Sequence, residues 1–142
     1  MPSFTIQLPN LQQVGPVVQV RLAVGSVVEN ILRQAGQPVP PPVVCMAMID
    51  TGASGTVVRQ DIVDGLSLNP IGVATINTPS STNVQCYEYL MRVLFPQNVV
   101  VETPVIAAPL QGQHIQCLIG RDILRPGVLV YTGYINQFTL SF

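Results

Sequence analysis

Apolar and polar residues alternate along much of the chain, and this pattern predicts β-strands. In the segment SFTIQL, the apolar residues Phe4, Ile6 and Leu8 occupy every second position, which is the period of a strand with one buried face. The segment PVVQVRLAV is rich in β-branched residues, which favour strands. By the same criteria we expect strands in GVATIN, VQCYEYLMRVLF, NVVVETPVIAAPL, HIQCLIG, GVLVYTG and FTLSF.

One apolar run does not alternate. Residues 43–49 read VVCMAMI, and a continuous apolar run of this length is typical of a strand that is buried on both faces. Residues 78–83, TPSSTN, lie between two expected strands and contain only turn-forming or small polar residues. They predict a β-hairpin with a loop of several residues.

Helix is expected in few places. In residues 26–36, SVVENILRQAG, Ser26 and Glu29 have the spacing of a capping box, and Gly36 suits the position after a helix. The apolar residues at helical spacing are Val28, Ile31, Leu32 and Ala35. The segments RQDIVDG and RDILRPG each predict a short helical turn. Thirteen prolines and eleven glycines punctuate many short strands, so the pattern predicts an all-β barrel or sandwich with one or two short helices.

The expected strands at the two ends raise a question of pairing. Both SFTIQL and FTLSF have an apolar face, and a terminal strand with free edges is a liability unless another strand pairs with it. The simplest partner is a second copy of the chain in a two-fold arrangement.

Composition excludes some functions and favours others. We treat residues 1–142 as a single domain, since 142 residues can bury a sizeable core. Charged residues make up only 9% of the chain, and the six basic residues are scattered, so a nucleic-acid partner is not expected. A surface with so little charge is expected to carry apolar patches that serve as interfaces.

The sequence offers no membrane segment, because the longest apolar run, residues 43–49, is far too short to span a bilayer. The first ten residues show no secretory signal pattern. The chain has three cysteines, Cys45, Cys86 and Cys117, which lie far apart in the sequence. An odd number of widely spaced cysteines favours reduced thiols in a cytoplasm-like compartment.

The chemistry of the chain is expected around Asp50, a carboxylate at the end of the apolar run. An ionised carboxylate in such a place needs hydrogen-bond donors. Thr51 supplies a hydroxyl, and Gly52 allows close approach of the backbone. Ser54 and Gly55 add a further polar group and a further flexible point. The residue types by themselves also fit a simple turn.

Two motifs resemble the retropepsin-type aspartic proteases. MIDTGAS, residues 48–54, is similar to the catalytic motif of that family, and CLIGRDIL, residues 117–124, is similar to its downstream motif. FTLSF and SFTIQL resemble the interface strands of the retroviral enzymes, and residues 78–83 lie where the family has its flap. Residues 14–42 are longer than in the viral enzymes and resemble bacterial members. The resemblance implies a retropepsin-like acid protease barrel that is active as a two-fold homodimer.

The resemblance also implies a mechanism. With a single Asp-Thr-Gly in the chain, the two carboxylates of an aspartic protease must come from two copies, so Asp50 and its symmetry mate would activate a water. Thr51 would link the two catalytic loops, and Gly52 would present its carbonyl to the substrate. No cofactor and no metal are implied.

An extended polypeptide is the substrate that the resemblance implies, bound under the flap. Ala53, Ser54 and Ile76 would line the cleft. The flap residues Thr78, Pro79, Ser80 and Ser81 would close over the peptide, although the flap contains Pro79 and no glycine, unlike the viral flaps.

Gly120, Arg121 and Asp122 are expected to support the site. In the viral enzymes the matching arginine pairs with an acid that stands where this chain has Ser54, so Arg121 is expected to reach Asp61 or the partner chain instead. Asp122 is expected to cap the short turn that begins at DIL.

Other functions have less support in the sequence. A catalytically silent peptide-binding or dimerisation module remains the alternative. His114 and Cys117 lack the further ligands of a zinc site, and a lone histidine without G-x-S-x-G gives no serine triad. We interpret His114 as a solvated or turn residue and Cys45 as a small core residue.

Overall fold

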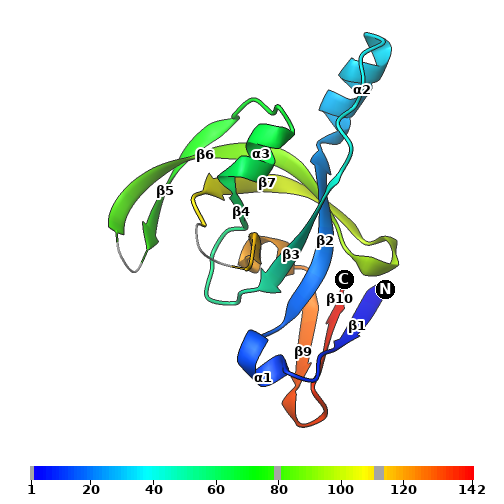
Figure 1. Cartoon of the computed structure of the whole chain (residues 1–142), viewed down its shortest axis with the longest axis vertical. Coiled ribbons are helices and arrows are strands. Elements are labelled where there is room, and N and C mark those ends of the chain that lie inside the picture. Colours follow the sequence, from blue (N-terminus) through cyan, green and yellow to red (C-terminus); the bar gives the residue numbers. More distant parts are fainter. Residues whose placement is uncertain (1, 79–80, 111–113) are drawn as a thin grey trace.

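The computed structural model describes residues 2–78, 81–110 and 114–142, and its strands form two sheets (Figure 1). The smaller sheet has the order β1-β10-β9. The larger, seven-stranded sheet has the order β2-β3-β8-β4-β7-β6-β5, and an additional pairing of β2 with β6 closes all but β5 into a barrel. The bounds are β1 Ser3–Gln7, β2 Val17–Val24, β3 Val43–Ile49, β4 Val57–Arg59, β5 Gly72–Thr78, β6 Ser81–Leu94, β7 Val100–Ala108, β8 Cys117–Ile119, β9 Val128–Thr132 and β10 Gln137–Ser141.

Every strand expected from alternation is present, and the prediction of an all-β fold is confirmed. The described residues contain more helix than the one or two short helices expected. These helices are α1 Leu11–Val14, α2 Ser26–Gln34, α3 Gln60–Gly65 and α4 Arg121–Leu124, with 3₁₀ turns at Pro96–Asn98 and Gly133–Ile135. α1 was not expected, because a helix of four residues is too short to show a period of 3.6.

Both sheets contribute to one hydrophobic core. Phe138 and Leu140 of β10 and Val20 and Leu22 of β2 are fully or almost fully buried in it. Phe4 of β1 stacks on a phenylalanine that follows β6, with 5.7 Å between ring centroids. The smaller sheet is therefore fixed to the barrel by apolar packing.

Strand β3 is not buried on both faces, so that prediction was wrong. Cys45, Ala47 and Ile49 face the core, whereas Val44 is 54% exposed and Met46 37% exposed. β3 has neighbours on both edges, β2 and β8, but in a single chain its outer face is not covered. A continuous apolar run in the sequence does not distinguish a strand with both faces covered from a strand with one face covered.

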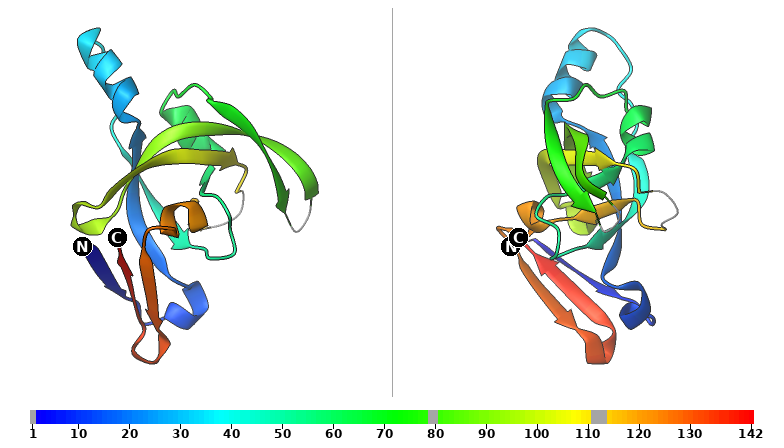
Figure 2. Two further views of the ribbon diagram at one scale, coloured as in Figure 1. Left: turned by 180° about the vertical axis from the view of Figure 1, so that it is seen from behind. Right: turned by 90° about the vertical axis from the view of Figure 1, so that its left-hand side faces the viewer.

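The hairpin of β5 and β6 arches out from the barrel on the same side as the loop that follows β3 (Figures 1 and 2). Pairing continues to Thr78 opposite Ser81, with an irregularity between Ile76 and Thr78. Thr78 therefore belongs to β5, and residues 81–83 belong to β6 rather than to the predicted loop.

The terminal strands pair with each other within the chain. β1 runs antiparallel to β10 from Ser3 opposite Ser141 to Gln7 opposite Gln137, and β10 also pairs with β9. The expectation that both ends await a partner chain was therefore wrong for β10, which has no free edge. Among the described strands, β1 and β9 each have one edge without a neighbour.

Helix α2 projects away from the body, at the end opposite the smaller sheet (Figure 1). It ends as expected: Gly36 has a positive φ of 66°, and its N–H donates to the Arg33 carbonyl while the Gln37 N–H donates to the Leu32 carbonyl. No residue of α2 is buried, and the apolar residues Val27, Val28 and Ile31 are exposed.

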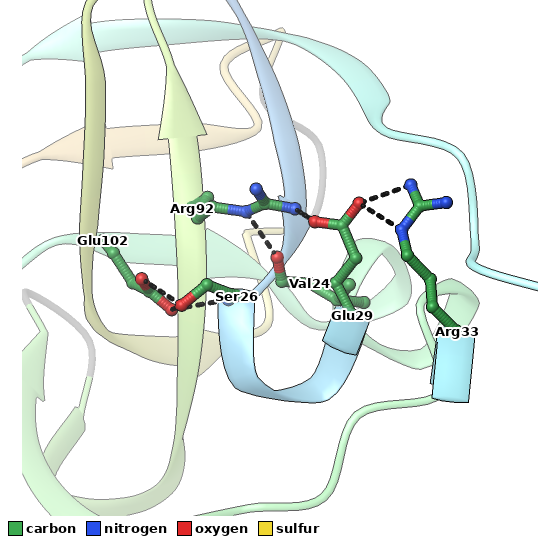
Figure 3. Close-up of polar contacts among 6 residues, drawn as sticks. All are labelled: Val24, Ser26, Glu29, Arg33, Arg92 and Glu102. Carbon is green, nitrogen blue, oxygen red and sulfur yellow. Dashed lines mark hydrogen bonds and ion pairs between the residues drawn. The ribbon is translucent and has the colours of Figure 1, made fainter. Parts of the chain in front are cut away.

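The predicted capping box is absent, because α2 begins one residue earlier than that motif requires. The N-cap is Gly25, which makes Ser26 the first helical residue. The N–H of Ser26 donates to the Glu102 carboxylate of β7 at 2.8 Å, and its hydroxyl donates to the same group (Figure 3). The Glu102 carboxylate of β7 thus accepts a hydrogen bond from a backbone N–H group that has no partner within the first turn of α2.

Glu29 joins α2 to β6. Its carboxylate accepts hydrogen bonds from Arg92 of β6 and from Arg33, the latter at 2.7 Å, and Arg92 also donates to the Val24 carbonyl (Figure 3). The hydrogen bonds from Arg33 and Arg92 lower the pKa of Glu29 below its usual value. These contacts fix the base of the projecting helix to the barrel.

We expect the attachment of α2 to weaken in acid. A carboxyl group with a lowered folded-state pKa stabilises the fold above its unfolded pKa, and this contribution is lost as the pH falls through the folded pKa. Hydrogen exchange of the α2 amides at about pH 7 and about pH 3 measures the effect. At the higher pH, Glu29→Gln should exchange faster than the wild type, and the difference should become smaller as the pH falls.

Glu88→Gln is the matched control, because no ion pair involves Glu88 among the described residues. It should leave exchange of the α2 amides unchanged at both pH values. Equal exchange of wild type and Glu29→Gln at the higher pH would contradict the assigned role of Glu29.

Candidate active site

Asp50 lies directly after β3, at the point where β3 and β8 run parallel. Ile49 pairs with Ile119, and the Asp50 N–H donates to the Ile119 carbonyl at 2.9 Å. The carboxylate oxygen Oδ1 of Asp50 accepts a hydrogen bond from the Gly52 N–H at 2.9 Å. The Ala53 N–H donates to the Asp50 carbonyl at 3.2 Å. A tight turn at the strand end therefore fixes the orientation of a partly exposed carboxylate.

Arg121 clamps the loop of residues 50–56, which we call the Asp50 loop. Its backbone N–H donates to the Ala53 carbonyl at 2.9 Å, and its Nη1 donates to the Thr51 carbonyl at 2.8 Å. The expected contact of Arg121 with Asp61 is not formed, because Arg59 binds Asp61 through two hydrogen bonds of 2.6 and 2.9 Å. That pairing lowers the pKa of Asp61.

Thr56 is the buried polar residue at the end of the Asp50 loop. Its hydroxyl donates to Asp122 Oδ1 at 2.8 Å and accepts from the Gly120 N–H at 3.1 Å. Its own N–H donates to Asp122 Oδ2 at 3.0 Å. Sequence reasoning did not identify this residue, although a hydroxyl between a glycine and two valines is a signal of a buried polar contact.

Asp122 does not act as the predicted cap of the short turn. The N-cap of α4 is Gly120, and Asp122 lies one residue inside the helix. Its carboxylate accepts from Thr56 and from the Ile123 N–H at 2.8 Å. The side chain therefore joins two parts of the chain that are far apart in sequence, which a local capping argument does not reveal.

Gly120 allows these two parts to touch. A Cβ atom at this position would lie 2.5 Å from the carbonyl carbon and oxygen of Gly55, far inside van der Waals contact. Residues 120–122, which we call the support segment, thus contact the Asp50 loop through backbone packing at Gly120, a carboxylate at Asp122 and a guanidinium at Arg121.

The residues expected to bind substrate lie on two elements. Ala53 is half-buried and Ser54 exposed on the Asp50 loop, while Ile76 is half-buried on β5. Among the described residues no hydrogen bond joins β5 to the Asp50 loop. Pro79 and Ser80 lie outside the described residues, as do the side chains of Thr78 and Ser81.

An open groove of about 290 Å³ adjoins the Asp50 loop. It lies between that loop, α4 and the start of β9. Its lining residues are Thr51, Arg121, Leu124, Arg125, Gly127 and Leu129. The surface next to the candidate catalytic carboxylate is therefore continuous with the smaller sheet.

The other candidate groups are not gathered into a site. His114 is exposed, as predicted, and Cys45 is a buried core residue, as predicted. Burial raises the pKa of the Cys45 thiol to about 12, so this thiol stays protonated. Within residues 2–78, 81–110 and 114–142, no three side chains are grouped as metal ligands, and no helix is long and apolar enough to cross a membrane.

Residues 35–123, which include both the Asp50 loop and the support segment, match the family described as aspartyl protease. No curated protein matches the chain.

Solved structures resemble this fold at low sequence identity. A retropepsin-like aspartic protease from Rickettsia conorii is 12% identical, with a TM-score of 0.57, over 99% of this chain and 91% of that one. The EIAV protease in complex with the inhibitor HBY-793 is 18% identical, with a TM-score of 0.53, over 84% and 92%. A foamy viral protease-reverse transcriptase is 19% identical, with a TM-score of 0.50, over 78% and 12%. The retropepsin-like fold is thereby confirmed.

We expect Gly120→Ala to destabilise the protein by about 1–3 kcal/mol or more, because the new methyl group overlaps the Gly55 backbone, which cannot move aside as a side chain would. Gly65→Ala is the matched control. Nothing lies within 4 Å of the place that its new methyl group would take, and the substitution should stabilise helix α3 by up to about 1 kcal/mol. Chemical denaturation of both variants measures the difference, and equal stabilities would contradict the close contact.

We expect Thr56→Val to cost about 1–3 kcal/mol, because it removes a donor from Asp122 and leaves the Gly120 N–H without its acceptor. Thr56→Ser keeps the hydroxyl and loses one methyl group, so it should cost about 1 kcal/mol or less. Urea denaturation of the two variants checks this order. A larger loss for serine than for valine would show that the hydroxyl is unimportant.

Proposed function

Because the chain belongs to the aspartyl protease family, we propose that it is an aspartic endopeptidase whose catalytic pair forms from the Asp50 residues of two identical chains. The observation that carries the proposal is the intact Asp50-Thr51-Gly52 turn at the end of β3, with its carboxylate oriented by the Gly52 N–H. A chain that had lost catalysis would not need to hold an acid in this way. The alternative, a catalytically silent peptide-binding or dimerisation module, therefore has less support.

The chemistry requires two carboxylates close together. Two like charges at contact distance cannot both ionise, so the pair shares one proton. The ionised carboxylate takes a proton from water as the water oxygen attacks the scissile carbonyl carbon. The protonated carboxyl donates its proton to the developing oxyanion. The Asp50 loop supplies one carboxylate per chain, and its clamp by Arg121 keeps that group in a fixed position.

The neighbouring residues have distinct roles in this proposal. The Thr51 side chain is exposed and links the two Asp50 loops across the two-fold axis. The Gly52 carbonyl accepts a hydrogen bond from the substrate backbone. Gly120, Arg121 and Asp122 position the loop without touching the substrate.

The proposed substrate is an extended polypeptide. It lies between the Asp50 loop and the hairpin of β5 and β6, where it makes strand-like main-chain hydrogen bonds. Ala53, Ser54 and Ile76 contact its side chains, together with the hairpin residues 78–81. Neither a metal nor a cofactor has a part in the reaction. Cys45, Cys86 and Cys117 are all free, which supports the proposed reducing, cytoplasm-like compartment.

We expect the wild type to cleave members of a diverse peptide library over about pH 3 to 7, the range in which a shared-proton pair titrates. Asp50→Asn should fold normally, because the amide has the same shape and its oxygen still accepts from Gly52, but it should lose cleavage. Mass spectrometry of the products measures both variants and reveals the side-chain preference.

Asp64→Asn is the matched control, since it makes the same change on the exposed surface of α3 and should cleave as the wild type does. Equal cleavage by Asp50→Asn would exclude an aspartic mechanism. Retained peptide binding without any cleavage by a dimeric wild type would favour the silent module.

A further inference from the structure

Helix α2 has its apolar side turned away from the barrel. Its polar side makes the attachment: Ser26 donates to Glu102 of β7, and Glu29 accepts from Arg92 of β6 (Figure 3). A surface helix of a globular protein normally does the reverse and packs its apolar side on the core. The apolar residues of α2 and its C-cap form a surface that we call the α2 stripe: Val27, Val28, Ile31, Leu32 and Ala35.

The α2 stripe is exposed along most of its length. Val27 is 61% exposed, Ile31 58% and Val28 39%. Ala35 is also exposed, and Leu32 is half-buried. Their spacings place these five side chains on one side of a helix. A helix that uses its polar side for attachment and leaves its apolar side in water has the properties of a docking element.

The α2 stripe carries no charge, and the charges beside it are already paired. Glu29 binds both Arg33 and Arg92, and Arg33 is the only charged residue in positions 30–49. A helix that binds anionic lipid usually has several lysines or arginines beside its apolar side. The stripe therefore suits an uncharged, apolar stretch of polypeptide better than a charged partner or a membrane surface.

The size of the stripe favours a partner that is already held elsewhere on the protein. The exposed apolar side chains of a nine-residue helix offer on the order of 300–400 Å², the size of a small functional patch. A stable complex needs about 800 Å² from each partner. A weak contact becomes effective when a second contact on the same protein holds the same partner. A polypeptide in the proposed substrate cleft fulfils that condition.

The α2 stripe and Asp50 lie at opposite ends of strand β3. The start of β3 lies beside the base of α2, since Val43 is opposite Leu22 of β2, and Asp50 follows the last residue of β3. Seven strand residues span about 23 Å, which an extended polypeptide covers with about eight to ten residues. A second copy that meets this one at Asp50 lies at the end of β3 away from α2 (Figure 1).

From these observations we propose that the α2 stripe is an exosite, a second binding surface for the polypeptide substrate. It binds an uncharged, apolar segment of the substrate that lies at least about eight residues from the scissile bond. That segment packs on Val27 and Ile31 while the scissile stretch lies in the cleft. The inference rests on the proposed function, because its occupant is the substrate of that function. Long polypeptides with such a segment are therefore better substrates than short peptides.

Three synthetic peptides test the exosite. The first is a short peptide chosen from the library for its cleavage, or for binding to Asp50→Asn if none is cleaved. The other two extend it through a Gly/Ser linker of about 25 residues, with an average reach of about 27 Å, to an apolar or a polar tail. The wild type should cleave the apolar-tail peptide with a KM about tenfold below that of the polar-tail peptide, at an unchanged kcat.

A double substitution and its matched control locate the effect on α2. Val27→Gln combined with Ile31→Gln keeps good helix formers but removes the centre of the apolar surface. It should abolish the tenfold preference and leave cleavage of the short peptide unchanged. Asn30→Gln places the same residue type in α2 outside the stripe and should keep the preference. Thermal unfolding checks that both variants are folded.

The exosite is overturned if the two tails give equal KM values with the wild type. It is also overturned if the preference persists in the double variant or disappears in Asn30→Gln. A weaker dimer in the double variant would assign the stripe to a second copy. Binding of the wild type to anionic lipid vesicles that the double variant loses would assign it to a membrane. Either result replaces the substrate as the occupant.

Direct binding separates this inference from the proposed function. Fluorescence anisotropy of the labelled peptides measures their affinity for Asp50→Asn, which leaves them intact. If the apolar tail strengthens binding but the wild type cleaves nothing, the α2 stripe stands as a peptide-binding surface and the endopeptidase proposal fails. If the wild type cleaves the short peptide and neither tail alters KM or affinity, the endopeptidase proposal stands and the exosite is wrong.

Discussion

The contact between the support segment and the Asp50 loop is the constraint on which the site depends. Gly120 lies against the Gly55 backbone, where no Cβ would fit, and the buried Thr56 hydroxyl joins Gly120 to Asp122. Buried polar groups are costly unless they are paired. Here Thr56 of the Asp50 loop pairs with Gly120 and Asp122 of the support segment. Without the other segment, the polar groups of either one would lose these hydrogen bonds.

Arg121 stabilises the Asp50 loop through a hydrogen bond to the backbone and not through an ion pair. Its guanidinium donates to the Thr51 carbonyl, and Asp61, the partner that the sequence suggested for it, forms its ion pair with Arg59. An exposed ion pair is screened by salt and contributes little, whereas a hydrogen bond to a backbone carbonyl fixes the direction of the main chain. The result is a loop whose carboxylate is oriented by backbone geometry, through Gly52, rather than by a neighbouring charge.

The exposed apolar residues include one group far from the Asp50 loop and one group beside it. A chain with only 9% charged residues leaves apolar side chains on its surface. Some of them lie on α2, whose base is attached to the barrel by polar contacts to Arg92 and Glu102. Others lie on β9, beside the groove that reaches Thr51. The first group is remote from the Asp50 loop (Figure 1), whereas the second adjoins it.

The sequence by itself determined the strands and the position of Asp50 at a strand end, because alternation and turn chemistry act over a few residues. It did not determine what covers each strand or which distant groups meet. The continuous run at residues 43–49 predicted two buried faces, yet Val44 is exposed. Ser26 and Glu29 had the spacing of a cap, yet their partners are Glu102 and Arg92. Asp122 had the place of a cap, yet it binds Thr56. Tertiary structure decided these points, because burial and hydrogen-bond partners depend on segments far away in the chain, which no local pattern encodes.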